Sequence, residues 1–151
     1  MNKEQHFVEE VGLFFEQRGV PRMAGRVLGW LLICEPPHQS ADDLAEALLA
    51  SKGSISTATR LLIRLGMIVR TSLPGQRRDY FVIRPDSWNW AMHEALTKVT
   101  EFRSLAEQGL ELLDGKDPEV RQRLEDMRAV YTFFEREWGA LVEQWERERS
   151  S

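Results

Sequence analysis

Residues 51–66, SKGSISTATRLLIRLG, combine arginines, small hydroxyl residues and glycines and contain no acid. At roughly 100° per residue in a helix, four apolar side chains share one edge of this stretch: Ile55, Ala58, Leu62 and Leu65. The opposite edge holds a glycine, two hydroxyls and two arginines: Gly53, Ser56, Thr57, Arg60 and Arg64. A solvated helix face usually mixes acids with bases, because opposite charges four residues apart stabilise a helix. The acid-free edge therefore predicts binding to a negatively charged partner.

The segment after Gly66 changes from helical to strand-like composition. MIVRTS (67–72) and DYFVI (79–83) are rich in β-branched and aromatic residues. They are joined by LPGQRR, in which Pro74 and Gly75 suit the centre of a type II turn. We expect a β-hairpin over 67–83 with Arg77 and Arg78 near its tip. Such arginines can protect an edge strand from aggregation, but directly after a basic helix they favour contact with the same polyanion.

Charge is distributed unevenly along the chain. Residues 51–84 hold seven basic residues and one acid, a net +6, so the remainder of this chain of net charge −4 carries −10. An acidic body with one basic segment repels a polyanion everywhere except at that segment. The overall acidic balance is therefore compatible with nucleic-acid binding.

The remaining elements are predicted to be helical. Apolar spacing and stop signals indicate helices over 5–18 and 22–34, the second closed by EPPH because two prolines cannot continue it. Ser40 is expected to cap a helix over 41–50, while Ser51 and Gly66 are expected to start and stop the helix over 52–65. The expected fold class is mainly α with a small β-hairpin, the winged helix-turn-helix plan with long C-terminal dimerisation helices. We expect one compact chain made of an N-terminal helix over 1–20, a winged core over 21–84 and a helical region over 85–151.

The C-terminal region carries a heptad seam. Its apolar residues alternate in spacings of four and three: Val120, Leu124, Met127, Tyr131, Phe134, Trp138, Leu141 and Trp145. An intramolecular hairpin with the apolar stripe of 88–113, broken at DGKDP, would cover part of this seam. Further apolar residues widen the face beyond what one neighbour covers. We therefore expect the tail, helped by 5–18, to form a homodimer interface.

At this point the chain resembles a known family. DDLAEALLASKGSISTATRLLIRLGMIVRTSLPGQRRDYFVI is similar to the DNA-binding core of MarR-type bacterial regulators. SKGSIS at the start of the helix over 52–65 and LGMI at the entry to the hairpin are most similar to the GbsR-like branch. The resemblance covers roughly 7–90. It implies a sequence-specific transcriptional regulator, expected to be a repressor, that binds double-stranded DNA as a homodimer.

The resemblance also implies how DNA is bound. Helix 52–65 would lie in the major groove and the wing 67–83 on the adjacent minor groove, with 40–50 bracing the helix against the backbone. Residues at the two helix starts would contact phosphate: Ser40, Ser51, Lys52 and Ser54. Gly53 would allow close approach, Ser56, Thr57 and Arg60 would face base edges, and Arg64, Arg77 and Arg78 would hold the backbone or enter the minor groove. Two such helices about 34–36 Å apart would favour a near-palindromic site.

An effector pocket is a further expectation. Aromatic residues that would form it are Phe14, Trp30, Trp88, Phe133 and Trp138. An aromatic cage suits a quaternary ammonium group, and the GbsR-like resemblance suggests a choline-like cation. The alternative is that this aromatic stripe is simply core.

Other classes of function find little support in the sequence. The three histidines are scattered and no HExxH, GxSxG, GxxxxGK or GxGxxG occurs, so we expect no enzyme, no cofactor and no metal site. The apolar run VLGWLLIC is far shorter than the roughly 20 residues of a membrane span, so we expect a cytoplasmic protein. Cys34 is expected to be a buried thiol without a redox role. The competing hypothesis is a winged-helix protein–protein adaptor that does not bind DNA.

Overall fold

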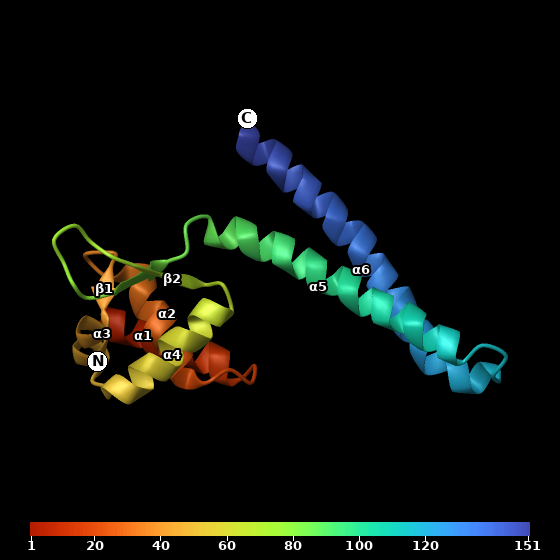
Figure 1. The fold of residues 1–151 in the computed structure, drawn as a ribbon, viewed down its shortest axis with the longest axis horizontal. Helices are drawn as coiled ribbons and strands as arrows, with labels where there is room; N and C mark the ends of the chain where they lie inside the picture. The colour runs from red at the N-terminus through yellow and green to blue at the C-terminus, as the bar shows by residue number, and fades with distance from the viewer. The chain divides into compact units, whose positions relative to one another are not determined.

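The first two helices of the chain pack closely against each other at two glycines, Gly12 and Gly25. The computed structural model describes residues 1–151, which form two units, Met1–Ser87 and Trp88–Ser151 (Figure 1). α1 (Lys3–Glu16) and α2 (Arg22–Ile33) confirm the helices predicted over 5–18 and 22–34. A Cβ atom added to Gly25 would lie 2.7 Å from the carbonyl oxygen of Val11 and 2.8 Å from Cα of Gly12. Gly25 therefore brings the two helix backbones close together in the first unit.

The helix-turn-helix follows α2. β1 (Gln39–Ser40) leads into α3 (Ala41–Leu48), and α4 (Lys52–Arg64) follows after a short turn. Both predicted N-caps are confirmed: the Ser40 hydroxyl accepts from the amide of Asp43 at 3.1 Å, and that of Ser51 accepts from the amide of Ser54 at 3.1 Å. Each cap satisfies an amide that the first helical turn leaves unpaired, and this fixes where the two helices begin.

The wing is a short antiparallel sheet. β2 (Ile68–Thr71) pairs with β3 (Tyr80–Ile83), and β1 pairs with the other edge of β3, so the strand order is β1-β3-β2. The predicted type II turn is confirmed, because the amide of Gln76 donates to the carbonyl of Leu73 at 3.0 Å and Gly75 has φ +77°. β1 was not predicted, since two residues, Gln39 opposite Phe81 and Ser40 opposite Tyr80, carry no alternation that a sequence could reveal.

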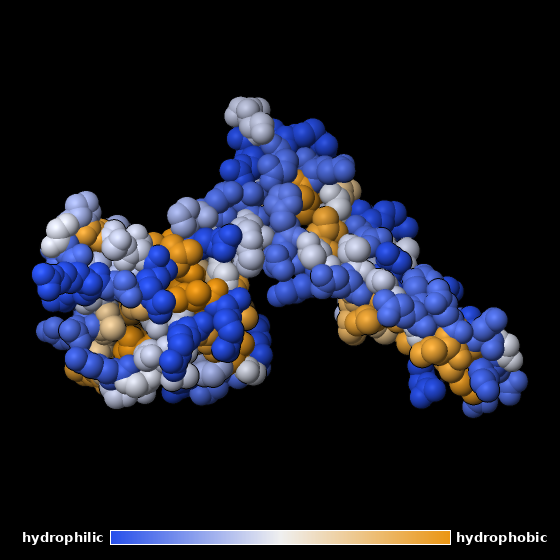
Figure 2. Space-filling model, in the orientation of Figure 1, coloured by the Kyte–Doolittle hydropathy of each residue, from blue (hydrophilic) through white to orange (hydrophobic).

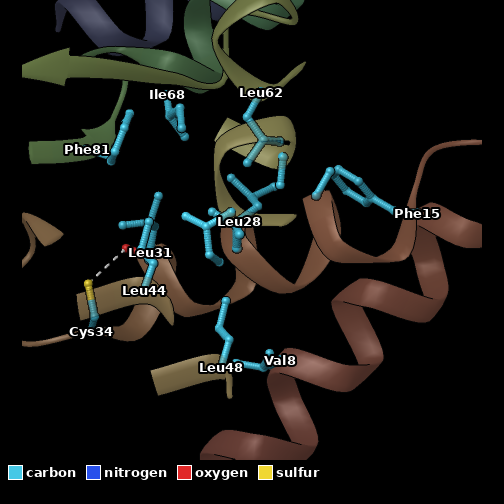
Figure 3. Packing of buried hydrophobic residues seen from close by; sticks show 14 residues of the cluster. Val8, Phe15, Leu28, Leu31, Cys34, Leu44, Leu48, Leu62, Ile68 and Phe81 are labelled. Carbon is cyan, nitrogen blue, oxygen red and sulfur yellow. Dashed lines mark hydrogen bonds between the residues drawn. The ribbon is translucent and has the colours of Figure 1, made fainter. Parts of the chain in front are cut away.

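One apolar core holds the first unit together (Figure 3). Leu44, Ile55 and Leu62 have no exposed surface, and Ile68 and Phe81 close the core from the sheet. Three of the four residues on the predicted apolar edge of α4 are therefore buried. The prediction is wrong for Leu65, which is 36% exposed because it is the C-cap of α4, where the chain leaves the helix.

Cys34 belongs to this core, as predicted. Its side chain is buried, and the thiol lies 3.8 Å from the carbonyl oxygen of Leu31 (Figure 3). Burial raises the pKa of the Cys34 thiol, so the reactive thiolate is disfavoured. This environment is that of a packing residue.

The second unit is an antiparallel pair of helices. α5 (Ser87–Leu112) and α6 (Pro118–Ser150) are joined at Gly115, which has φ +75°. The indole N–H of Trp138 donates to the carbonyl of Met92 at 2.9 Å, and the rings of Phe102 and Tyr131 meet edge to face at 4.7 Å. Neither these nor the other helices combine the length and apolar content needed to cross a membrane.

An ion pair links the two helices of this hairpin. Nε of Arg103 lies 3.1 Å from Oε2 of Glu135. Hydrogen bonds from Thr100 and from Arg103 stabilise the charged carboxylate and hold the pKa of Glu135 below its usual range. The ionised form of Glu135 therefore stabilises the folded hairpin.

Replacing Gly25 with alanine should destabilise the first unit by about 1–3 kcal/mol, because the new methyl group meets backbone atoms that cannot rotate away. Urea unfolding followed by circular dichroism would measure the loss. Gly53→Ala in α4 is the matched control, since the nearest atom to its added Cβ is 4.0 Å away. Equal stabilities of the two variants would contradict the close packing of α1 and α2.

Stability should depend on the ionisation of Glu135. A depressed folded-state pKa contributes stability above the unfolded pKa of glutamate, and this stability is lost as the pH falls through the folded value. Glu135→Gln should therefore lower the melting temperature at pH 7, and the difference from the wild type should shrink towards pH 3. Glu143→Gln, which removes an exposed acid of α6, is the control and should show no such pH-dependent difference. Thermal melts across this pH range provide the measurement.

Candidate nucleic-acid interface

The outer face of α4 carries the side chains that were predicted to face a polyanion. Gly53, Ser56, Thr57, Arg60 and Arg64 are all exposed. The one hydroxyl residue of the helix that turns inward donates from Thr59 Oγ1 to the carbonyl of Ile55 at 2.9 Å. The buried edge and the exposed edge thus divide as the helical spacing indicated, and the exposed edge contains no carboxylate.

Four arginines on α4 and the wing are left without an acidic partner. Arg60, Arg64, Arg77 and Arg78 are exposed and form no ion pair in the structure. Two other cations of this region are compensated: Nζ of Lys52 lies 3.1 Å from Asp42, and Nε of Arg70 lies 3.5 Å from Asp79. Uncompensated guanidinium groups are suited to bidentate contacts with phosphate or with guanine.

The start of α4 is already engaged in its own cap. The Ser51 hydroxyl accepts from the Ser54 amide and donates to the Ser54 hydroxyl at 2.9 Å. The Lys52 ammonium is shared with Asp42 on α3, although its side chain remains 78% exposed. These groups lie at the surface, but a phosphate would have to share them with their present partners.

Ser40 requires a correction. Its side chain is 3% exposed, and it forms a reciprocal capping box in which the Ser40 amide donates to Asp43 Oδ2 at 2.9 Å. Ser40 is itself part of β1, and its buried hydroxyl already accepts from the Asp43 amide, so it is not accessible to a phosphate. We therefore leave Ser40 out of the proposed interface.

The wing carries Arg77 and Arg78 just beyond its turn. Gly75 and the bond between Gln76 and Leu73 fix the turn, and both arginines follow it on the exposed stretch before β3. The Tyr80 ring at the start of β3 packs edge to face against His38 at 5.3 Å. The base of the wing is therefore anchored to the segment before α3, while its tip is exposed.

One structurally important residue, Arg26, escaped sequence reasoning. Its Nε donates to Glu9 on α1 at 2.7 Å, and another guanidinium nitrogen donates to the carbonyl of Leu48 at 3.0 Å. Leu48 is the last residue of α3, so Arg26 ties α1 to the turn that precedes α4. The partners are separated by 17 and 22 residues, and no local pattern in the sequence signals such a contact.

The predicted dimerisation seam is partly used within the chain. Leu124, Tyr131 and Trp138 contact α5 through Gly109, Phe102 and Met92. Met127 is half-buried, and four other seam residues remain substantially exposed: Val120, Phe134, Leu141 and Trp145. Phe133 on α6 and Leu105 on α5 are 50% and 53% exposed. Figure 2 shows hydrophobic groups along this hairpin, most extensively towards the turn between α5 and α6.

The residues expected to form an aromatic pocket lie in different settings. In the first unit, Phe14 lies under the guanidinium of Arg18 at 3.5 Å, whereas Trp30 donates its indole N–H to Gln39 at 3.1 Å. In the second unit, Phe133 is exposed and lies near Arg136, Trp88 is 56% exposed, and the Trp138 N–H is bonded to Met92. No two of these rings within one unit pack against each other, so neither unit contains the expected cage.

The first unit has the element order of a winged helix-turn-helix: α3, a turn, α4 and the hairpin β2–β3, with exposed arginines on α4 and the wing. This arrangement is typical of DNA-binding transcriptional regulators. A family model described as MarR family matches residues 18–79, and one described as MmpR5-like MarR family transcriptional regulator matches residues 86–148. The chain belongs to the MarR family of transcriptional regulators.

Similar proteins support this assignment. The HTH-type transcriptional regulator MmpR5 of Mycobacterium tuberculosis (strain ATCC 25618 / H37Rv) is 43% identical over 129 residues, covering 85% of this chain and 78% of that protein. The HTH-type transcriptional repressor OpcR of Bacillus subtilis (strain 168) is 25% identical over 135 residues, covering 82% and 72%. A crystal structure of a transcriptional regulator, 38% identical, matches with a TM-score of 0.84 over 97% of this chain and 99% of that one. The predicted MarR-type resemblance is confirmed, while the GbsR-like branch stays a prediction.

Proposed function

We propose that this regulator binds double-stranded DNA as a homodimer, with α4 in the major groove and the wing on the adjacent minor groove. The observation that carries the proposal is the acid-free exposed face of α4 and the wing, on which Arg60, Arg64, Arg77 and Arg78 have no carboxylate partner. Phosphates supply the missing negative charge and release bound counterions as they do so. The competing adaptor function would need neither an acid-free helix nor an arginine-tipped wing.

Reading and anchoring are assigned to different residues. Ser56, Thr57 and Arg60 lie within α4 and are proposed to contact base edges, with Arg60 bidentate to a guanine. Arg64 at the end of the helix and the two arginines of the wing are proposed to contact phosphates or the minor groove. Gly53 adds no side chain to the exposed face, which favours close approach to the DNA backbone.

Dimerisation is proposed to use the exposed apolar side chains of the second unit. Phe134, Leu141 and Trp145 are 45%, 50% and 41% exposed on the seam, a large apolar surface for a chain that remains monomeric. A second copy of the same hairpin offers a matching surface by two-fold symmetry. Two α4 helices presented about 34–36 Å apart would then read a near-palindromic site.

Repression, a cytoplasmic location and control by a small molecule complete the proposal. Repression is supported by the described role of the relative OpcR. A homodimer blocks transcription when its site overlaps a promoter, and an effector that changes the orientation of α4 would relieve the block. The choline-like cation inferred from the sequence stays a hypothesis about that effector.

Substitutions at Arg60 and in the wing should have different effects on binding. Arg60→Ala should weaken binding to a selected genomic site by about 5- to 100-fold and change binding to random duplex little, because a base contact is lost. The double variant Arg77→Ala with Arg78→Ala should weaken binding to both duplexes. The slope of log affinity against log salt concentration should fall in magnitude by about one unit for each phosphate contact that is lost. Fluorescence polarisation at two salt concentrations measures both effects.

Arg147→Ala is the control for these variants, because it also removes one positive charge but lies exposed on α6, outside the helix-turn-helix and the wing. An equal loss of selected and random binding in Arg60→Ala would refute its reading role. Binding that is absent or insensitive to salt in the wild type would favour the adaptor.

The dimer should dissociate when charge enters the seam. Leu141→Glu places an acid on a half-exposed seam position, so the fold should persist while the 17.5 kDa monomer replaces the dimer in sedimentation. Thr132→Glu is the control, because Thr132 is exposed and lies nine residues before Leu141, about 180° round α6 and so on the opposite face. A wild-type protein that sediments as a monomer at micromolar concentration would exclude the proposed dimer.

A further inference from the structure

A cavity of about 470 Å³ lies in the first unit between the start of α1, α2 and the end of α3. Trp30 and Leu48 supply apolar lining, and Glu4, Glu9 and Arg26 supply charge. Its volume lies within the range of small-molecule sites in proteins. None of the residues assigned to DNA contact or to the dimer seam lines it.

The charged groups of the cavity favour a cation. Each nitrogen of Arg26 already forms one bond: Nε donates to Glu9, and the other two nitrogens donate to the Met23 sulfur at 3.5 Å and the Leu48 carbonyl at 3.0 Å, so one N–H on each terminal nitrogen is left. An anion would also meet the two carboxylates of the lining, Glu4 and Glu9. Glu4 forms no ion pair, and Glu9 gives only Oε1 to Arg26, so carboxylate oxygens remain available at the wall.

The apolar groups favour a ligand with an apolar body. Trp30 is held in place by the bond from its indole N–H to Gln39, and an indole face attracts organic cations. Leu49, at the edge of the cavity, is 90% exposed and has a left-handed backbone at φ 50°. A leucine that is both strained and solvated can gain burial when a ligand fills the cavity.

We infer that this cavity binds a small organic cation with an aromatic or alkyl body, and that its occupancy weakens DNA binding. The ammonium group would lie against Glu4 and Glu9 and compete with Arg26 for the Glu9 carboxylate. Arg26 also donates to Leu48, the last residue of α3, so loss of its position frees the turn before the Ser51 cap of α4. The coupling to DNA rests on the proposed function of α4, whereas binding in the cavity does not.

Binding can be tested without DNA. Benzylammonium is the probe, and isothermal titration calorimetry should detect its binding to the full chain, with benzyl alcohol binding more weakly and phenylacetate weakest. Glu4→Gln should weaken benzylammonium binding by about two- to fivefold, the size of effect expected for one partly exposed charge contact. Glu10→Gln is the matched control, because Glu10 also lies on α1 but pairs with His6 and does not line the cavity.

Coupling is tested by measuring DNA affinity with and without benzylammonium at constant ionic strength, adjusted with sodium chloride. The wild type and Glu10→Gln should lose affinity by about fivefold or more at saturating benzylammonium, and Glu4→Gln should require more of it. Absent binding, binding unaffected by Glu4→Gln, or equal binding of phenylacetate would overturn the site. A duplex affinity that is measurable but unchanged by bound benzylammonium would overturn the coupling alone. Failure to bind any duplex would instead refute the proposed function. The calorimetric titrations, which contain no DNA, would then still test whether the cavity binds benzylammonium.

Discussion

Burial of the apolar edge of α4 determines which residues this protein exposes. Ile55 and Leu62 are fully buried, and each such side chain contributes about 1.5–3 kcal/mol relative to exposure. Surface ion pairs such as that of Lys52 with Asp42 contribute less than about 1 kcal/mol. The orientation of α4 is therefore set by its apolar edge, and the arginines on the other edge follow from helix geometry.

That order of energies explains how an acidic chain keeps a basic surface. The arginines need no attractive partner within the fold, because the core already fixes the helix that carries them. Lys52 and Arg70 are paired with nearby acids and stabilise the scaffold locally, whereas Arg60 and Arg64 stay uncompensated. Charge left unpaired in the folded chain is available to a ligand without first breaking an internal bond.

Sequence reasoning succeeded where the responsible forces are local. The Ser51 cap and the Pro74–Gly75 turn each depend on residues at most three positions apart, and the buried edge of α4 depends on helical period. It failed for β1, whose two residues pair with a strand some forty positions away, and for the bonds of Arg26 to Glu9 and Leu48. Ser40 shows a third limit, because the sequence identified a capping serine but not that the capped end would be buried.

The second unit shows why a periodic seam does not by itself reveal its partner. The same heptad residues contact α5, through Tyr131 and Trp138, and expose Phe134 and Leu141 to solvent. Ala106, Leu110 and Val142 are the buried apolar residues of this hairpin, too few to stabilise two helices of 26 and 33 residues strongly. If a second copy covers the exposed seam, association supplies much of the missing burial. Folding of this unit would then depend on protein concentration, as in dimers whose monomers are only marginally stable.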